Sequence, residues 1–248
     1  MAFEVSVDSY LLGHFIDTFE VEQEARLEPV AVPRREGYLS DEAYSTGMRI
    51  IMGGLIYNDD PDDTRSDLNI LKNAFSKGRK LITLYDDRQI SAQKEFFRLS
   101  YEEQDLRRVR WEASMISDDF GFVAVNPTVT TATVTTSPST STSTNAGNLE
   151  ADLVIRLTPG SVNIASGVRV DNISSSKFFT YNAVITTGTY IEVDTANLTV
   201  VDNSGVNKLE NFQGDFFGLV SGANQIKYTG TTSSAVLNLT YRSKYDGP

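Results

Sequence analysis

The chain has 248 residues, is 40% hydrophobic and carries a formal charge of −11, a composition that fits one large or two ordinary globular domains. The sequence has no cysteine, which excludes disulfides and thiolate metal sites, and it has no apolar run of about 18 residues, so we expect no membrane-spanning helix. The acidic balance disfavours sequence-independent binding to nucleic-acid backbones, because there is no cation excess to release counterions.

In the first half a strand is predicted at 48–58, and a single helix follows it. Asp60 suits the N-cap and Pro61 the first helical position. Apolar or small side chains then recur at helical spacing, at Thr64, Leu68, Leu71 and Phe75. Lys77 and Gly78 predict the end of the helix, with Lys77 in the last turn and Gly78 at the C′ position.

Three further strands are expected after this helix, at 79–87, 90–104 and 107–120. In the last of them Val109, Trp111, Ala113 and Met115 alternate with polar residues, which predicts one buried face. The first half, residues 1–127, is therefore predicted to be an α+β domain, a β-meander with one helix.

Residues 128–148 consist almost entirely of Thr, Ser and other small residues. Such a segment offers little apolar surface to offset its ordering entropy, and we predict a linker or a long surface loop. Residues 149–248 contain short alternating strands separated by Gly, Asn, Asp and Ser, which is typical of an all-β sandwich.

The stretch from Asn211 to Tyr228 combines aromatics with glycines at a bend between two strands. Phe212, Phe216 and Phe217 are expected to fill the core of the sandwich. Gly218, Gly222 and Asn224 are expected to supply positive φ angles. A glycine-rich phosphate cradle is the alternative, but it needs a strand–loop–helix context with a Lys or a GxGxxG pattern, and neither is present.

Both halves resemble the distal tail proteins of siphophages. In the second half the matching residues are Phe217, Leu219, Gly222, Asn224, Ile226, Tyr241, Arg242 and Tyr245, with Ser221 in place of the usual proline. In the first half they are Gly78, Leu81, Asp87, Arg88, Phe122 and Pro127. The resemblance covers most of the chain and is carried by structural signatures.

The resemblance implies a structural virion protein at the distal end of the phage tail, made in the host cytoplasm. The N-terminal domains of this family form a ring, commonly hexameric, below the tail tube, and the C-terminal domains have a galectin-like fold. The implied partners are further copies of the chain, the tail tube protein above and the hub or tail-tip protein below. Exposed edges of strands 48–58 and 106–118 are expected to contact the next subunit, and the acidic residues are expected to line a lumen that repels DNA.

No catalytic, cofactor-binding or metal-binding residue is predicted. His14 is the only histidine, so His-based nucleophilic and zinc sites lack their usual parts. The acidic run at 58–63 could bind a hard cation, but helix capping explains the same residues. The basic residues at 107–110 are expected on a solvated face or in salt bridges between subunits. The alternative function is binding of a host-surface saccharide by the sandwich, through exposed aromatics among Phe178, Tyr181 and Tyr190.

Overall fold

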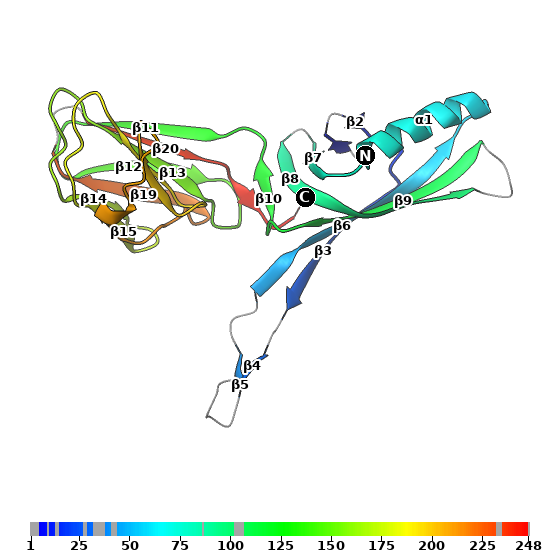
Figure 1. The fold of residues 1–248 in the computed structure, drawn as a ribbon, viewed down its shortest axis with the longest axis horizontal. Coiled ribbons are helices and arrows are strands. Elements are labelled where there is room, and N and C mark those ends of the chain that lie inside the picture. Colours follow the sequence, from blue (N-terminus) through cyan, green and yellow to red (C-terminus); the bar gives the residue numbers. More distant parts are fainter. Residues whose placement is uncertain are drawn as a thin grey trace. The chain divides into compact units, whose positions relative to one another are not determined.

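The structure, a computed structural model, describes residues 5–8, 10–12, 15–26, 29–31, 38–40, 44–85, 87–101, 107–231 and 235–247. The chain divides into two compact units, the first running to Val125 and including Asp246 and Gly247, the second spanning Asn126–Tyr245. Figure 1 shows the fold of each unit, coloured along the sequence from blue at the N-terminus to red at the C-terminus. Among the described residues, no helix is both long and apolar enough to cross a membrane.

The N-terminal unit is built on one antiparallel sheet with the strand order β2-β1-β7-β8-β9-β6-β3, and β10 pairs with the start of β8. Its strands are β1 (Val5–Val7), β2 (Tyr10–Leu11), β3 (Thr18–Arg26), β6 (Tyr44–Tyr57), β7 (Arg79–Leu84), β8 (Arg88–Tyr101), β9 (Arg108–Ser117) and β10 (Phe122–Ala124). Between β3 and β6 the chain forms a separate two-stranded hairpin, β4 (Pro29–Ala31) with β5 (Tyr38–Ser40). In Figure 1 this hairpin lies beyond the ends of β3 and β6.

One face of the N-terminal sheet is buried, as the alternation in β9 predicted. Val109, Trp111, Ala113 and Met115 are all buried. Helix α1 (Pro61–Ala74) connects β6 to β7, and Phe75 at its end stacks on Phe97 at 5.3 Å between ring centroids. We call this buried side the inner face.

Helix α1 begins where the sequence predicted and ends earlier. The Asp60 side chain accepts a hydrogen bond from the Asp62 N–H at 2.8 Å, and Pro61 occupies the first turn. The helix ends at Ala74 with Phe75 as its C-cap, so the prediction that Gly78 lies at C′ was wrong. The Phe75 ring is buried against the sheet, and the chain leaves the helix axis there; Gly78, with φ of +104°, belongs to the turn before β7.

A close backbone approach fixes the segment before β3 on the inner face. The Trp111 indole Nε1–H donates to the carbonyl of Phe15 at 2.9 Å, and the Asp17 N–H donates to the carbonyl of Gly53 at 2.9 Å. A Cβ at Gly54 would overlap the Phe15 carbonyl oxygen. This position of β6 therefore requires glycine for space rather than for its backbone dihedrals.

The C-terminal unit contains two five-stranded antiparallel sheets. The first has the order β11-β20-β13-β16-β17 and the second the order β12-β19-β14-β15-β18. The strands are β11 (Thr128–Val134), β12 (Ser139–Asn145), β13 (Leu153–Thr158), β14 (Val168–Asn172), β15 (Lys177–Tyr181), β16 (Ile191–Asp194), β17 (Thr199–Asp202), β18 (Phe212–Gly214), β19 (Gly222–Thr229) and β20 (Ala235–Tyr241), with a 3-10 turn at Leu209–Asn211 and a short β21 (Lys244–Tyr245).

A single hydrophobic core joins the two sheets into the predicted sandwich. Alternate residues of β13, Leu153, Ile155 and Leu157, meet Val170 of β14 and Ile226 of β19 in that core. Along each of these strands the remaining residues point outward, as expected when one face of each sheet is buried. The described part of the chain is thus mostly β-structure with one α-helix.

The expectation of a linker or loop at residues 128–148 was wrong. Residues 128–134 form β11, which pairs with β20 from Thr128↔Tyr241 to Val134↔Ala235. Residues 139–145 form β12, which pairs with β19. Threonine is a good strand former, and β19 and β20 supply the hydrogen bonds and apolar contacts that the segment itself lacks.

Candidate functional site

The two strands expected to offer free edges lie inside the N-terminal sheet. β6 pairs with β3 on one side and β9 on the other, and β9 pairs with β6 and β8. The prediction of exposed edges at 48–58 and 106–118 was therefore wrong, because side-chain alternation reports which face is buried and says nothing of which edge is paired. Among the described strands, β3 is the long strand at one end of the sheet order, and it pairs with β6.

The opposite side of this sheet, which we call the outer face, carries mixed polar and apolar side chains. It is defined by residues of β3, β6, β8 and β9 that lie in register across the sheet: Thr18, Glu20, Glu22, Arg49, Ile51, Gly53, Leu55, Tyr57, Phe96, Arg98, Ser100, Arg108, Arg110, Glu112, Ser114 and Ile116. Nearly all are exposed or half-buried. The outer face is therefore the large accessible surface of this unit.

Charges on the outer face are paired across strands. Arg49 Nε lies 3.3 Å from Glu95 Oε2, and Arg49 Nη1 lies 3.8 Å from Glu22 Oε2. The Ser114 hydroxyl donates to the same Glu95 carboxylate at 2.7 Å. Because these side chains are partly exposed, each pair contributes little stability by itself, but together they fix carboxylate and guanidinium groups in one register.

Two arginines lie flat over aromatic rings on the same face. The Arg98 guanidinium lies 4.4 Å from the centroid of Phe96, and that of Arg108 lies 4.9 Å from the centroid of Tyr57. Exposed stacks of this kind are worth about 0.5–1 kcal/mol. An exposed guanidinium of this kind can donate to a carboxylate of another protein. Arg108 and Arg110 are exposed, as the expectation of a solvated face for the basic residues at 107–110 requires, and salt bridges between subunits stay a prediction.

A groove of about 600 Å³ opens on this outer face where β6 carries Gly53. Its charged lining consists of Asp17 before β3, Glu20 of β3, Arg98 of β8, and Arg110 and Glu112 of β9. Charges of both signs therefore surround a floor that has no side chain at Gly53.

Local structure explains the other residues considered from the sequence as candidate sites. The acidic run caps α1 through Asp60, and the described residues contain no cluster of three or more His, Asp or Glu placed to hold a metal ion. Asp118 pairs with Arg79, and the Asp119 N–H donates to the Ser117 hydroxyl at 3.0 Å. His14 lies outside the described residues.

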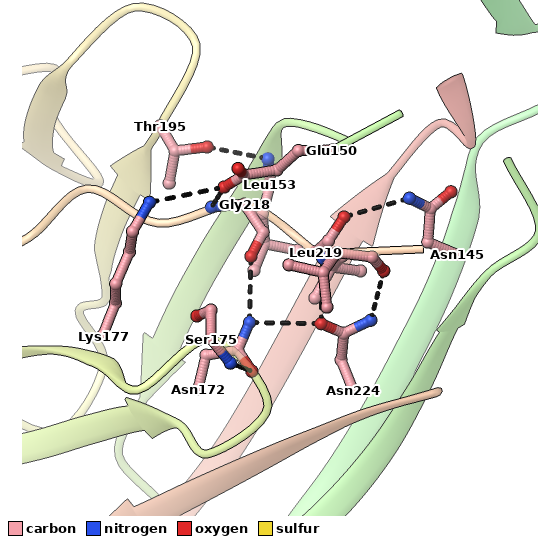
Figure 2. A network of polar contacts seen from close by, with 11 residues as sticks. Asn145, Glu150, Leu153, Asn172, Ser175, Lys177, Thr195, Gly218, Leu219 and Asn224 are labelled. Carbon is pink, nitrogen blue, oxygen red and sulfur yellow. Dashed lines mark hydrogen bonds and ion pairs between the residues drawn. The ribbon is translucent and has the colours of Figure 1, made fainter. Parts of the chain in front are cut away.

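The glycine-rich bend of the C-terminal unit is held by buried asparagines (Figure 2). Asn224 is fully buried in β19. Its Oδ1 accepts from the Val220 N–H at 3.0 Å and from Asn172 Nδ2 at 3.2 Å, and its Nδ2 donates to the carbonyls of Val220 at 2.7 Å and Gly222 at 3.0 Å. Three of these bonds join Asn224 to backbone groups of the bend, and the fourth joins it to the neighbouring strand β14.

Asn172 and Asn145 extend this network to both sides of the bend. Asn172 Nδ2 also donates to the Gly218 carbonyl at 2.9 Å. Asn145 Nδ2 donates to the carbonyls of Leu149 at 2.7 Å and Leu219 at 3.0 Å. The three asparagines come from β12, β14 and β19, so they fasten residues 218–222 to three strands of one sheet.

An acidic side chain completes the network at Gly218. The Gly218 N–H donates to Glu150 Oε1 at 3.0 Å, and Lys177 Nζ lies 3.7 Å from the same oxygen. A Cβ at Gly218 would lie 2.5 Å from the Ala151 carbonyl oxygen. Glycine is thus required here by close approach.

The expected positive φ angles occur only in part. Gly222 has φ of +86°, as expected, whereas Gly218 and Asn224 do not have positive φ, and Gly214 does. Phe217 is fully buried, and Phe212 and Phe216 are partly buried against the core. The stretch is therefore a structural bend, and the buried role of Asn224 is the part that sequence reasoning missed.

The three aromatics considered for sugar stacking do not form one surface. Tyr181 is buried in the core. Phe178 lies on the outside of the β12–β18 sheet, where the Arg169 guanidinium covers it at 3.7 Å. Tyr190 precedes β16 of the other sheet and lies under Arg156 at 4.3 Å.

One solved structure shares the fold of nearly the whole chain, and others are less similar. The crystal structure of the SPP1 Dit protein, described as a paradigm of the hub adsorption apparatus in phages that infect Gram-positive bacteria, has a TM-score of 0.65 at 16% identity, over 97% of this chain and 98% of that chain. Chains of the activated phage P2 baseplate, solved with Ca and with Sr, have TM-scores of 0.40 and 0.41 at 7% identity, over 99% and 100% of this chain and 92% and 100% of theirs.

The sequence itself matches a family model over its second unit. No curated protein matches the chain. Residues 146–245 match the model described as the siphovirus-type tail component, C-terminal domain. That range begins at the end of β12, ends with β21 and contains the asparagine-fastened bend. The C-terminal unit is therefore similar to the siphovirus-type tail component domain, which confirms the resemblance to distal tail proteins noted in the sequence.

Proposed function

We propose that this chain is a distal tail protein that forms a ring, hexameric by analogy with its family, between the tail tube and the tail tip or baseplate hub. The observation that carries the proposal is the match of residues 146–245 to the siphovirus-type tail component domain. The likeness of nearly the whole chain to SPP1 Dit in fold supports the proposal. The protein then acts as a structural virion component rather than as an enzyme.

Ring closure requires a head-to-tail contact, in which one surface of a subunit meets a different surface of the next. The N-terminal unit offers two such surfaces, the terminal strand β3 and the outer face. Charges of both signs around the Gly53 groove give that face the means to select one register, because like charges brought together in a wrong register repel. We propose that neighbouring N-terminal units meet through these surfaces.

Two finer features of the function rest on the sequence and on family likeness. A net charge of −11 suits a lumen through which DNA passes without adhering. The C-terminal sandwich is proposed to be of the galectin type, and a superposition of its ten strands on a galectin would test this. The proposed partners are the tube protein above and the hub or tip protein below.

The test is the mass of the purified full-length protein in solution, followed by negative-stain images. We expect a closed multimer with a central hole. Arg98→Glu with Arg110→Glu, on the outer face, should shift the mass towards the monomer without changing the thermal midpoint. Arg65→Glu, on the exposed side of α1, is the matched control and should leave the multimer intact. A wild-type protein that stays monomeric at all concentrations, and a native tail in which it forms no ring, would overturn the proposal.

A further inference from the structure

Strand β12 closes one edge of the second sheet of the sandwich without a single apolar side chain. It pairs with β19 on one side and is the terminal strand of its sheet. Its inward positions hold Ser139, Ser141, Ser143 and Asn145, and its outward positions hold the exposed residues Thr140, Thr142 and Thr144. A strand that is polar on both faces specifies its pairing weakly.

The inward serines lie against the core and leave hydroxyls unpaired. They lie opposite Tyr228, Ile226 and Asn224 of β19, which are all buried. In the part of the chain that the structure describes, the hydroxyl oxygens of Ser141 and Ser143 are buried and have no hydrogen-bond partner. Because burial of an unpaired polar group is unfavourable, these two side chains weaken the attachment of β12 to the core that it covers.

Strand β11, the terminal strand of the other sheet, is attached differently. It has the same length as β12 and is also rich in threonine, but its inward residues include Ala132 and Val134, which pack in the core. No hydroxyl of β11 is among the buried, unpaired oxygens of the described residues. The two edge strands therefore differ in their contact with the core although their compositions are alike.

The two ends of β12 also differ. At its C-terminal end, Asn145 Nδ2 donates to the carbonyls of Leu149 at 2.7 Å and Leu219 at 3.0 Å (Figure 2). Before its start, the hydrogen bond from the Gly230 N–H to the Ser137 hydroxyl, at 3.1 Å, is exposed. Local opening is therefore expected to begin at Ser139 and to stop at Asn145, as in a strap that is hinged at one end.

We propose that β12 is a displaceable strand and that an extended segment of another protein takes its place on β19. This segment carries small aliphatic residues at the three serine positions, so that it buries apolar surface against Ile226 and Tyr228 and leaves no hydroxyl unpaired. An acidic residue at the position of Thr140 lies opposite Lys227. A second copy of this chain is not the donor, because its β12 brings the same serines to the same place.

Hydrogen exchange of the full-length protein, measured by mass spectrometry, tests whether β12 opens by itself. Residues 139–145 should exchange at least tenfold faster than residues 128–134, the matching edge strand. Ser141→Ala combined with Ser143→Ala should slow the exchange of residues 139–145 at least threefold, because no hydroxyl is then buried unpaired. Thr142→Val, on the exposed face, is the matched control and should leave it unchanged. Equal exchange of the two strands in the wild type overturns the proposal.

A synthetic peptide tests the exchange of strands itself. It copies residues 137–147 with the changes Ser139→Val, Ser141→Val, Ser143→Val and Thr140→Glu, and the control peptide carries Thr140→Glu alone. By fluorescence anisotropy, we expect the valine peptide to bind the full-length protein at least tenfold more tightly than the control peptide. Binding should speed the hydrogen exchange of residues 139–145 in the protein.

The alanine double variant of the protein should bind the valine peptide at least threefold more weakly, because its open form is less populated. Binding that leaves the exchange of residues 139–145 unchanged is addition to a free edge and overturns the proposal, as does the absence of binding. Every residue involved lies in the C-terminal unit, so neither result bears on the proposed ring.

Discussion

Asn224 meets four hydrogen-bond partners from a position inside the sandwich, and three of the four are backbone groups of the bend that it fastens. Leu219 in the bend pairs with Ala151 through two backbone hydrogen bonds, whereas the Val220 N–H and C=O and the Gly222 C=O bond to the Asn224 side chain. An asparagine suits this task because one amide both donates twice and accepts twice. At the residue scale, the residues of this stretch that match the family therefore have two structural roles. They form hydrogen bonds with buried backbone groups, or they fill the core.

Replacing Asn224 by Ala should destabilise the C-terminal unit strongly. The change removes the side-chain partner of the Val220 N–H and C=O and of the Gly222 C=O, which we expect to lower the free energy of unfolding by about 3 kcal/mol. Denaturant unfolding measures this. Gln225→Ala, at the next and exposed position of β19, is the control and should stay within about 0.5 kcal/mol. Equal effects of the two changes would contradict the assignment.

Asp8 offers a pH-dependent test in the N-terminal unit. Burial raises the pKa of Asp8, but the hydrogen bonds from the Leu81 N–H at 3.0 Å and from Lys80 at 2.9 Å outweigh it and hold the pKa below its ordinary value. A lowered folded pKa means that the ionised form adds stability above the unfolded pKa of about 4, and that this is lost as the pH falls through the folded value.

The Asp8→Asn variant isolates this effect, because asparagine tolerates the φ of +47° at this position. We expect a lower thermal midpoint than the wild type at pH 7 and no difference near pH 2, as followed by circular dichroism. In a Lys80→Met background the difference at pH 7 should shrink. A gap that is the same at both pH values would show that charge is not its origin.

At the scale of elements, β6 depends on the space that two adjacent glycines leave on its two faces. Gly54 faces inward beneath the Phe15 carbonyl, whereas an added Cβ at Gly53 faces outward and lies 3.2 Å from the Trp111 carbonyl oxygen. The Phe15 carbonyl also accepts from the Trp111 indole, so moving it breaks a buried hydrogen bond. The strand thus joins the sheet to the segment that covers its core.

Gly54→Ala should therefore destabilise the N-terminal unit by about 2–4 kcal/mol, in the range of an overpacked core position with a lost hydrogen bond. Trp111 is the single tryptophan of the chain, so its fluorescence during denaturant unfolding measures the stability of this unit. Gly53→Ala carries the same change of residue on the open side and is the control; we expect it to cost less than about 1 kcal/mol. A larger effect at Gly53 than at Gly54 would refute this account.

At the scale of the whole molecule, each unit has a core of its own, and the Thr/Ser-rich segment belongs to the second unit as the strands β11 and β12. Unit boundaries therefore fall before this segment and not within it. Removing residues 128–148 as though they were a linker would strip one edge strand from each sheet of the sandwich.

We predict that the fragment 126–245 folds by itself and is monomeric, while the full-length chain assembles. The fragment retains both sheets and the shared core, and the surfaces proposed for the ring lie in the other unit. Light scattering gives the mass and calorimetry shows whether unfolding is cooperative. The fragment 149–245, cut at the boundary expected from composition, should lack a cooperative transition. A fragment 126–245 that forms the same multimer as the full chain would move the assembly contact to the sandwich.

The sequence by itself determined the features that depend on local order. These are the capped start of α1, the buried face of β9, the short alternating strands of the second unit and the resemblance to distal tail proteins. Only the tertiary structure decided that β6 and β9 are interior strands, that residues 128–148 are strands and that Asn224 is buried. Each of these depends on which distant strand supplies the pairing or the covering surface, and backbone hydrogen bonds between strands are made by groups that every residue type except proline carries alike.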